Sequence, residues 1–538
     1  MAGVMHSTFQ LRQIWKGLGI LSFAGLFFPG LAFILFGVAA PQDSLVGALW
    51  GWGILLCACA LPSFAQRPTL FLFGLLAPFY CWYIFRFNHA LPSQVVAMAS
   101  SASASEVAEF LVMEWRGLLL AAGCGVLMAI GHRIPCQFDK RRMAVIGLGL
   151  VSVLVSQRTF STYFSSSQRP LLSNSLVSQS YPTAFLGALL HERYEDDFVA
   201  QSIKPGQVSA ANEVDLAILV IGESARADHW SLNGYEKPTT PNIGRENVIN
   251  FPAVRSIGNC SAVSVPAMLT MQGVEDRPLL TGPVIRQPSI VEIFRAAGYF
   301  TALVTNQETS SFARTGSNFD VARSIYVNGA FGNAYDTDLL PEIEIVIAAP
   351  MKRKFLIVHL RGSHFNYRDR YRDQFDVFTH GVIGEYDNSI LATDAFLATL
   401  IARLKATGLR VALAYSSDHG DDFDKNESRL KLHCQIPSNN DTVVPAFFWL
   451  QGEFPSEKVG NLRKNARHHV SQAGIVPALL DLSGIQMNSP LMARTLTLPQ
   501  TESLEQLTID PLGVVYRCTL AQGCWKDEPV GRSSKVHE

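Results

Sequence analysis

The long apolar segments, most of which lie in the first 160 residues, restrict the fold of this chain more than any other feature. A membrane-spanning helix needs about 20 largely apolar residues. Five runs come close to this length, and the last two are short enough to require tilting. Because the pattern recurs, it favours a membrane domain over a single cleaved signal peptide or a set of buried core helices. The five predicted spans are 15–38, 45–64, 69–85, 117–131 and 143–156.

Basic residues between these runs predict the orientation. Arg12 and Lys16 precede the first run, Arg67 lies between the second and third, and residues 140–142 separate the fourth from the fifth. Since basic loops stay in the cytoplasm, the N-terminus is expected there. An odd number of spans then places everything after about residue 157 on the other side. In a bacterium this means a multi-pass inner-membrane protein with a periplasmic C-terminal part.

The rest of the chain divides by composition into a polar linker with short surface helices, 157–213, and a domain at 214–538. In this domain strand-like and helix-like segments alternate, which predicts an α/β fold with a mostly parallel sheet. The tail after about residue 510 shows no clear pattern. We expect strands at 215–221, 301–305, 354–360, 410–416 and 444–450, and helices at 262–270, 289–297 and 386–406.

Two of the predicted strands end in side chains that bind metals. Glu223 follows the run ending at residue 221, and Asp418 and His419 follow the run 411–415. The carboxyl ends of strands are where open α/β sheets place their sites. Carboxylates and imidazole together are suited to Zn²⁺. A helix cap or a surface charge is the ordinary alternative for Glu223 alone.

Ser261 precedes the predicted helix 262–270 and is a candidate nucleophile. Backbone N–H groups at a helix N-terminus bind phosphate and favour an alkoxide, and a metal can activate the hydroxyl. The ordinary alternative is an N-cap serine. His364 and His433 stand in loops, where each is either a surface or packing histidine or a ligand for phosphate or a second metal.

Net charge and cysteine content narrow the class further. The formal net charge is −1, so no nucleic-acid partner is implied. The exported part contains Cys260, Cys434, Cys518 and Cys524, an even number that permits disulfides in an oxidising compartment. Cys518 and Cys524 are close in sequence and form a plausible pair.

Several motifs in the same order resemble the phosphoethanolamine transferases of Gram-negative envelopes, which belong to the alkaline phosphatase/sulfatase superfamily. The resemblance covers most of the chain and implies a multi-pass α-helical membrane domain, 1–156, followed by an α/β periplasmic domain of alkaline phosphatase/sulfatase type. The matching segments are 222–226, 231–235, 240–242, 261–266, 386–390, 417–420 and 444–449.

The resemblance also implies the residues of the site. Zn²⁺ would be bound by Glu223, Ser261, Asp418 and His419, with Ser261 as nucleophile where the family usually has threonine. His364 and His433 match histidines that contact the phosphoryl group or a second zinc ion, and Asn306 matches a position near the phosphoethanolamine. If the residues adjoining Cys260 and Cys434 face one zinc ion, those two sulfurs can pair, and we expect this disulfide.

The implied reaction transfers phosphoethanolamine from phosphatidylethanolamine, through a covalent Ser261 intermediate, to an envelope glycan or lipopolysaccharide. Members that modify lipid A carry a disulfide flanking the nucleophile, but Ile257 and Ala267 stand at those positions. This leaves lipopolysaccharide core sugars or periplasmic glucans open as acceptors.

Other activities also stay open. A phosphoglycerol transferase or another hydrolase of the superfamily is the main alternative, and a non-catalytic membrane scaffold is a further one. Sulfatase activity is disfavoured, because the C/S-x-P-x-R pattern that starts at Ser264 has Met268 in place of arginine.

Overall fold

The structure is a computed structural model that describes residues 52–58, 61–87, 115–126, residue 141 and, with several internal gaps, 203–526. The chain divides into two compact units, 1–195 and 196–538. The predicted spans 15–38 and 143–156 lie outside the described residues.

In the first unit the helix α4, Ser63–Phe87, contains the third predicted span. Its stretch Phe64–Phe85 is, among the described residues, the one helix long and apolar enough to cross a membrane, with mean hydropathy 1.5. Residues 52–58 are also helical and lie in the second predicted run, and the helix Trp115–Val126 overlaps the fourth. The prediction of a loop around Arg67 was wrong, since α4 includes it. This exposed side chain can stay solvated near a helix end, so it does not interrupt the helix.

The second unit is built on an eight-stranded sheet with the order β5-β4-β6-β2-β7-β8-β3-β9. Neighbouring strands from β5 to β7 are parallel, β8 is antiparallel to β7 and to β3, and β9 is parallel to β3. The predicted mostly parallel sheet is therefore confirmed. The strands are β2 Leu216–Gly222, β3 Ile249–Arg255, β4 Phe300–Thr305, β5 Val321–Ser324, β6 Lys354–His359, β7 Val411–Ser417, β8 Val443–Gln451 and β9 Val470–Ser471.

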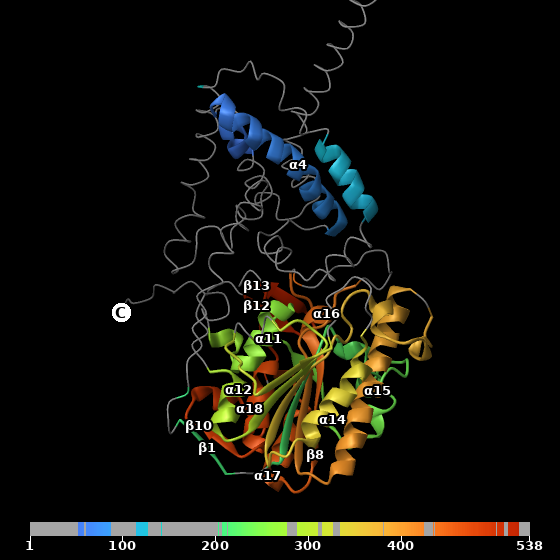
Figure 1. Ribbon diagram of the computed structural model, residues 1–538, viewed down its shortest axis with the longest axis vertical. Helices are drawn as coiled ribbons and strands as arrows, with labels where there is room; N and C mark the ends of the chain where they lie inside the picture. Colours follow the sequence, from blue (N-terminus) through green and yellow to red (C-terminus); the bar gives the residue numbers. More distant parts are fainter. Residues whose placement is uncertain are drawn as a thin grey trace, which may run out of the picture. The chain divides into compact units, whose positions relative to one another are not determined.

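Helices cover both faces of this sheet and bury two apolar cores (Figure 1). Alternate residues of β2 belong to different cores: Leu219 packs on one face and Val220 on the other. Because both faces are covered, every residue of β2 is buried, which explains the uninterrupted apolar run. One core includes α11 Ser261–Thr270, α12 Ile290–Ala296 and α18 Ile475–Leu482; the other includes α14 Leu340–Ala348 and α15 Val382–Thr407.

The tail, for which no regular pattern was expected, forms a three-stranded antiparallel sheet of β11 Gln506–Ile509, β12 Val515–Thr519 and β13 Gly523–Lys526. Its strands are too short to show a clear period, and tertiary contacts hold them. Ile509 N donates to the carbonyl of Ile257 at 2.9 Å. Cys518 lies opposite Cys524 and forms the predicted disulfide with it.

The remaining elements are short. β1 Val208–Ala210 pairs antiparallel with β10 Ile485–Met487, so strand pairing extends into the segment assigned to the linker. Two further helices are α16 Asn439–Thr442 and α17 Ser456–Asn465. Single 3-10 turns are η3 Ala227–His229, η4 Ser231–Asn233, η5 Ile243–Arg245, η6 Val274–Asp276, η7 Asp336–Leu339, η8 Tyr367–Arg370, η9 Asp373–Phe375, η10 Gln472–Gly474 and η11 Pro490–Arg494.

Candidate functional site

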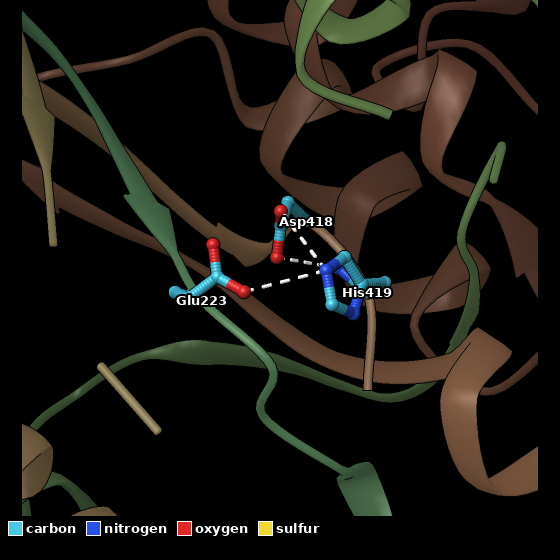
Figure 2. Close-up of side chains that lie close together, drawn as sticks. All are labelled: Glu223, Asp418 and His419. Carbon is cyan, nitrogen blue, oxygen red and sulfur yellow. Dashed lines mark hydrogen bonds and ion pairs between the residues drawn. The ribbon is translucent and has the colours of Figure 1, made fainter. Parts of the chain in front are cut away.

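Three side chains of metal-binding type converge at the carboxyl ends of β2 and β7. The two strands are parallel neighbours with Gly222 opposite Ser417, so the residues that follow them meet. His419 Nε2 lies 3.3 Å from Glu223 Oε1 and 3.5 Å from Asp418 Oδ2 (Figure 2). One ligand atom from each residue lies within 4.8 Å of the other two, and all three are buried. Glu223 is thus neither a surface charge nor a helix cap.

A strained turn holds Glu223 in place. Ser224 is buried with φ of 55°, a left-handed conformation that is uncommon for residues other than glycine. Its hydroxyl donates to Glu223 Oε1 at 2.6 Å. The Tyr386 hydroxyl donates to the Ser224 carbonyl and accepts from Arg226 N, both at 2.7 Å. On the other side lies Gly362, where a Cβ would come within 2.7 Å of the Glu223 carbonyl oxygen.

Ser261 is the first residue of α11, and its hydroxyl reaches the same cluster. It donates to Glu223 Oε2 at 3.1 Å and lies 3.0 Å from His419 Nε2. The N-cap residue is Cys260, so the alternative of an N-cap serine is wrong. The hydroxyl is directed at the metal-binding side chains instead.

The charges of this cluster are strongly coupled. Burial raises the pKa of Asp418 to about 7, and the charge of Glu223 adds to this effect. Burial also acts to raise the pKa of Glu223, but the adjacent His419 holds it well below its usual range. For His419, burial disfavours the cation, yet the two carboxylates raise its pKa to about 10. Two buried carboxylates thus require a positive charge beside them.

The donor set fits a divalent cation. Asp418 Oδ2 is buried and has no hydrogen-bond partner among the described residues, which is costly unless a cation compensates it. His419 Nδ1 lies 2.6 Å from the carbonyl of Gly420. When Nδ1 donates to this carbonyl, Nε2 is left as a ligand, the usual arrangement for a metal-binding histidine. Two carboxylates, one imidazole and a hydroxyl form a set typical of zinc.

The other predicted site residues lie at different places. His364 is half-buried in the loop after β6. Its charge contributes to lowering the pKa of Glu223, so its imidazole lies near the Glu223 carboxylate. Asn306 follows β4 and is buried, and its Nδ2 donates to Asp336 Oδ1 at 3.0 Å and to the carbonyl of Ala334. His433 lies outside the described residues. Their roles in substrate binding remain predictions.

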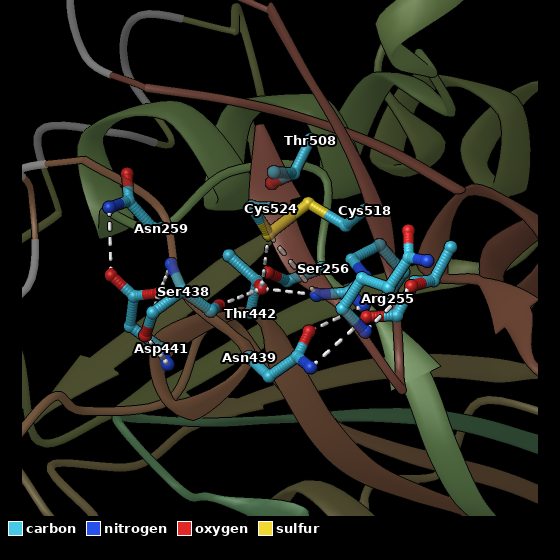
Figure 3. Close-up of a disulfide and its surroundings, with 12 residues drawn as sticks. Arg255, Ser256, Asn259, Ser438, Asn439, Asp441, Thr442, Thr508, Cys518 and Cys524 are labelled. Atoms are coloured by element: carbon cyan, nitrogen blue, oxygen red, sulfur yellow. Dashed lines mark hydrogen bonds between the residues drawn. A yellow bond between two sulfur atoms is a disulfide. The ribbon is translucent and has the colours of Figure 1, made fainter. Parts of the chain in front are cut away.

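The loop before Ser261 is anchored from a distant segment. Cys260 forms the expected disulfide with Cys434, whose N–H donates to the Asn259 carbonyl at 3.0 Å. Asn259 Nδ2 donates to Asp441 Oδ2 at 2.9 Å (Figure 3). Burial raises the pKa of Asp441 to about 6, and Ser438 N donates to its other oxygen. These contacts fix the backbone next to the candidate nucleophile.

The tail sheet extends this anchor (Figure 3). Asn439 Nδ2 donates to the carbonyl of Thr519 at 3.1 Å, and its Oδ1 accepts from Arg255 at 2.9 Å. The Arg255 guanidinium is fully buried and lies 3.8 Å from Cys524 Sγ. Burial lowers the pKa of Arg255 to about 10. The second disulfide therefore packs against the segment that ends just before the Ser261 loop.

Two glutamines at this site were missed by the sequence reasoning. Gln307 Nε2 donates to Glu223 Oε2 at 3.0 Å. Gln472 joins the end of β7 to the loop before Ser261. Its Nε2 donates to the Ser417 carbonyl at 2.6 Å, and its Oε1 accepts from Ile257 N at 3.2 Å. The sequence did contain a signal for Gln307, because it stands just beyond the end of the predicted strand 301–305, next to Asn306. No comparable signal marks Gln472.

Two known proteins of similar sequence are named as transferases. Phosphoethanolamine transferase EptC of Escherichia coli O18:K1:H7 is 24% identical over 550 residues, which cover 92% of this chain and 94% of the relative. Phosphatidylethanolamine transferase Mcr-1 of Escherichia coli is 28% identical over 352 residues, which cover 57% of this chain and 63% of the relative.

Solved structures share the fold. The integral membrane lipooligosaccharide phosphoethanolamine transferase A (EptA) of Neisseria meningitidis matches with a TM-score of 0.69 at 20% identity, covering 90% of this chain and 98% of that chain. The C-terminal periplasmic domain of EcEptC from Escherichia coli, solved in complex with Zn, matches with a TM-score of 0.51 at 24% identity. The match covers 58% of this chain and 94% of that chain. The predicted alkaline phosphatase/sulfatase type of α/β domain, preceded by a helical region, is confirmed.

A family model described as Sulfatase matches residues 215–485, half of the chain, and this range includes every residue of the cluster around Glu223. The expectation of an enzyme and the resemblance to phosphoethanolamine transferases are confirmed by the relatives. The chain therefore belongs to the sulfatase family, and within it the chain resembles the phosphoethanolamine transferases.

Proposed function

We propose that this protein transfers phosphoethanolamine from phosphatidylethanolamine to an envelope glycan or lipopolysaccharide through a covalent intermediate on Ser261. The observation that carries the proposal is the Ser261 hydroxyl, which lies 3.1 Å from Glu223 Oε2 and 3.0 Å from His419 Nε2. The names of the relatives support the transferred group, and the Zn complex of the EcEptC domain supports the metal.

Zinc would be held by Glu223, Asp418, His419 and Ser261. When bound there, it acts as a Lewis acid and lowers the pKa of a coordinated hydroxyl. The chain adds its own stabilisation, because Ser261 begins a ten-residue helix whose positive end favours negative charge on oxygen.

In the first step the Ser261 oxygen forms a bond to the donor phosphorus. The bond between phosphorus and the diacylglycerol oxygen breaks, and diacylglycerol leaves with the proton that the serine hydroxyl gave up. In the second step a hydroxyl or protonated phosphate oxygen of the acceptor forms a bond to phosphorus and gives up its proton. The bond between phosphorus and the Ser261 oxygen breaks, and the Ser261 oxygen takes up a proton in exchange. We assign contacts to the phosphoethanolamine group to His364, His433 and Asn306.

The proposed location is the bacterial inner membrane, with five spans in 1–156, a cytoplasmic N-terminus and a linker at 157–213 before the periplasmic catalytic domain 214–538. The two disulfides support an oxidising compartment for this domain. The apolar helix α4 supports membrane insertion. A membrane location also suits a reaction whose donor is a lipid.

The full-length protein in detergent, loaded with zinc, tests this function. After incubation with phosphatidylethanolamine and no acceptor, intact-mass analysis of the parent should show one added phosphoethanolamine group. Peptide mass mapping should place this group on the peptide that contains Ser261. Ser261→Ala should show none, whereas Ser261→Thr, the residue usual in the family, should keep the adduct and measurable transfer. An adduct on Ser261→Ala, or near-normal transfer by it, would contradict the assignment.

A phosphoglycerol transferase is the competing function, because the same nucleophile can attack phosphatidylglycerol. The same mass measurement with each lipid supplied separately distinguishes the two groups by the mass that Ser261 gains. Mass spectrometry of lipid A, core oligosaccharide and periplasmic glucans from cells with and without the enzyme then identifies the acceptor.

A further inference from the structure

Gln307 reaches the metal-binding carboxylate from a third strand. It follows β4, and its side chain crosses the end of β6 to Glu223 at the end of β2, in the sheet order β4-β6-β2. Its own backbone is fixed by Thr305, whose hydroxyl accepts from Gln307 N at 2.9 Å and donates to the Gln307 carbonyl at 3.1 Å. Thr305 thus fixes the Gln307 backbone, and the bond to Glu223 fixes its side-chain amide.

The partners of this amide determine which way it faces. Its nitrogen lies 3.0 Å from Glu223 Oε2 and 2.6 Å from the carbonyl oxygen of Leu360. A carbonyl oxygen and an ionised carboxylate can only accept, so both require the NH₂ group rather than the amide oxygen. Both hydrogens of Nε2 are thus used to join Glu223 to the backbone after β6.

As a result, each oxygen of the Glu223 carboxylate has a neutral donor besides the candidate nucleophile Ser261. Ser224 Oγ donates to Oε1 at 2.6 Å, and Gln307 Nε2 donates to Oε2. Rotation of the carboxylate would break both bonds in a buried site, where leaving a polar group unpaired is costly. Donors of this kind orient metal-ligating carboxylates, and they also stabilise the ionised form.

The neutrality of the donor matters as much as its position. A cationic side chain at residue 307 would pair with Glu223 and compete with a metal cation for the same carboxylate. The amide supplies a hydrogen bond without adding charge to a cluster that already contains His419. It also contacts the same oxygen that accepts from Ser261, so it aligns the carboxylate with the nucleophile.

We propose that Gln307 is a positioning residue, which holds the Glu223 carboxylate in the orientation that binds the divalent cation and keeps it aligned with Ser261. This inference rests on the proposed function only for the identity of the site, since zinc binding can be measured without any substrate.

The test is the zinc affinity of the full-length protein in detergent, measured by competition with a chromogenic chelator. Gln307→Met has a similar length but no donor, and we expect its zinc dissociation constant to rise about 10- to 100-fold. At saturating zinc we expect a lower kcat with a nearly unchanged KM for phosphatidylethanolamine. Gln307→Lys retains a hydrogen-bond donor but adds a positive charge. Because this charge competes with the cation for Glu223, Gln307→Lys should bind zinc more weakly than Gln307→Met.

Gln451 provides a matched control. Its Nε2 also donates to two backbone carbonyls, those of Leu404 at 3.2 Å and Leu409 at 2.8 Å. It pairs with Val411 at the opposite end of β7 from Asp418, so Gln451→Met should leave zinc affinity unchanged. A Gln307→Met protein that binds zinc as the parent does would overturn the inference, and so would an equal loss in Gln451→Met. A parent protein that binds no zinc would instead refute the proposed site itself.

Discussion

The disulfide between Cys260 and Cys434 should contribute more to stability than the one between Cys518 and Cys524. A crosslink restricts the unfolded chain more when it closes a longer loop. The sequence separations are 174 and 6 residues. The chain-entropy relation then gives about 5 kcal/mol for the first bridge and about 2 kcal/mol for the second, as upper estimates.

These values translate into different thermal shifts. For a unit the size of 196–538, unfolding entropy scales with length, so 1 kcal/mol corresponds to about 1.5 °C. Replacing Cys260 and Cys434 by serine should lower the apparent Tm of the catalytic unit by about 7 °C. The matched replacement of Cys518 and Cys524 should lower it by about 3 °C. The measurement is thermal unfolding of full-length protein in detergent, at one zinc concentration and one scan rate.

The same pair of variants should differ in activity. Loss of the Cys260–Cys434 bridge frees the residue before Ser261, so transfer should fall even at temperatures where the protein is folded. The Cys518–Cys524 bridge, which joins the strands β12 and β13, lies further from the nucleophile, so its loss should reduce transfer less. If replacing Cys518 and Cys524 lowers the Tm as much as replacing Cys260 and Cys434, or more, the loop-closure reasoning is refuted. A thiol map with both Cys260 and Cys434 free would refute the bridge itself.

Two further predictions concern metal and pH. Removal of zinc by a chelator should abolish transfer and lower the apparent Tm, and added zinc should restore both; transfer that persists with no bound metal would contradict the proposed site. Burial raises the pKa of Asp441 to about 6 in the folded state, so its protonation favours folding: its contribution is fully present below pH 4 and is lost as the pH rises through 6. Asp441→Asn should therefore reduce the difference in stability between pH 5 and pH 8 by roughly 1 to 2 kcal/mol, seen as a smaller Tm difference than in the parent. An unchanged difference would show that Asp441 does not titrate in this range.

The strands that carry the metal-binding residues could be predicted because they are buried on both faces. In β2 and β7 every position is apolar or small and buried, so the sequence shows an unbroken run that stops where the polar residues begin. Glu223 and Asp418 stand directly after these ends. Since carboxyl ends of parallel strands meet at one edge of a sheet, their convergence could be expected.

Elements with weaker local patterns could not be predicted. β9 has two residues, and the strands of the tail sheet have four or five, too few to establish a period. They form because other parts of the chain supply hydrogen-bond partners, as Ile257 does for Ile509. The helix predicted at 386–406 is α15, but it starts four residues earlier, at Val382.

The sequence by itself determined the two-part organisation expected of this chain, the α/β class of its second part and the residue types available for metal chemistry. These depend on local properties: apolar length, strand and helix periods, and polar residues at strand ends. Only the tertiary structure decided which polar side chains support the site. Gln307 is 84 residues from Glu223, and Gln472 is 215 residues from Ile257. Contacts over such separations depend on the order and register of the strands, which no local pattern contains.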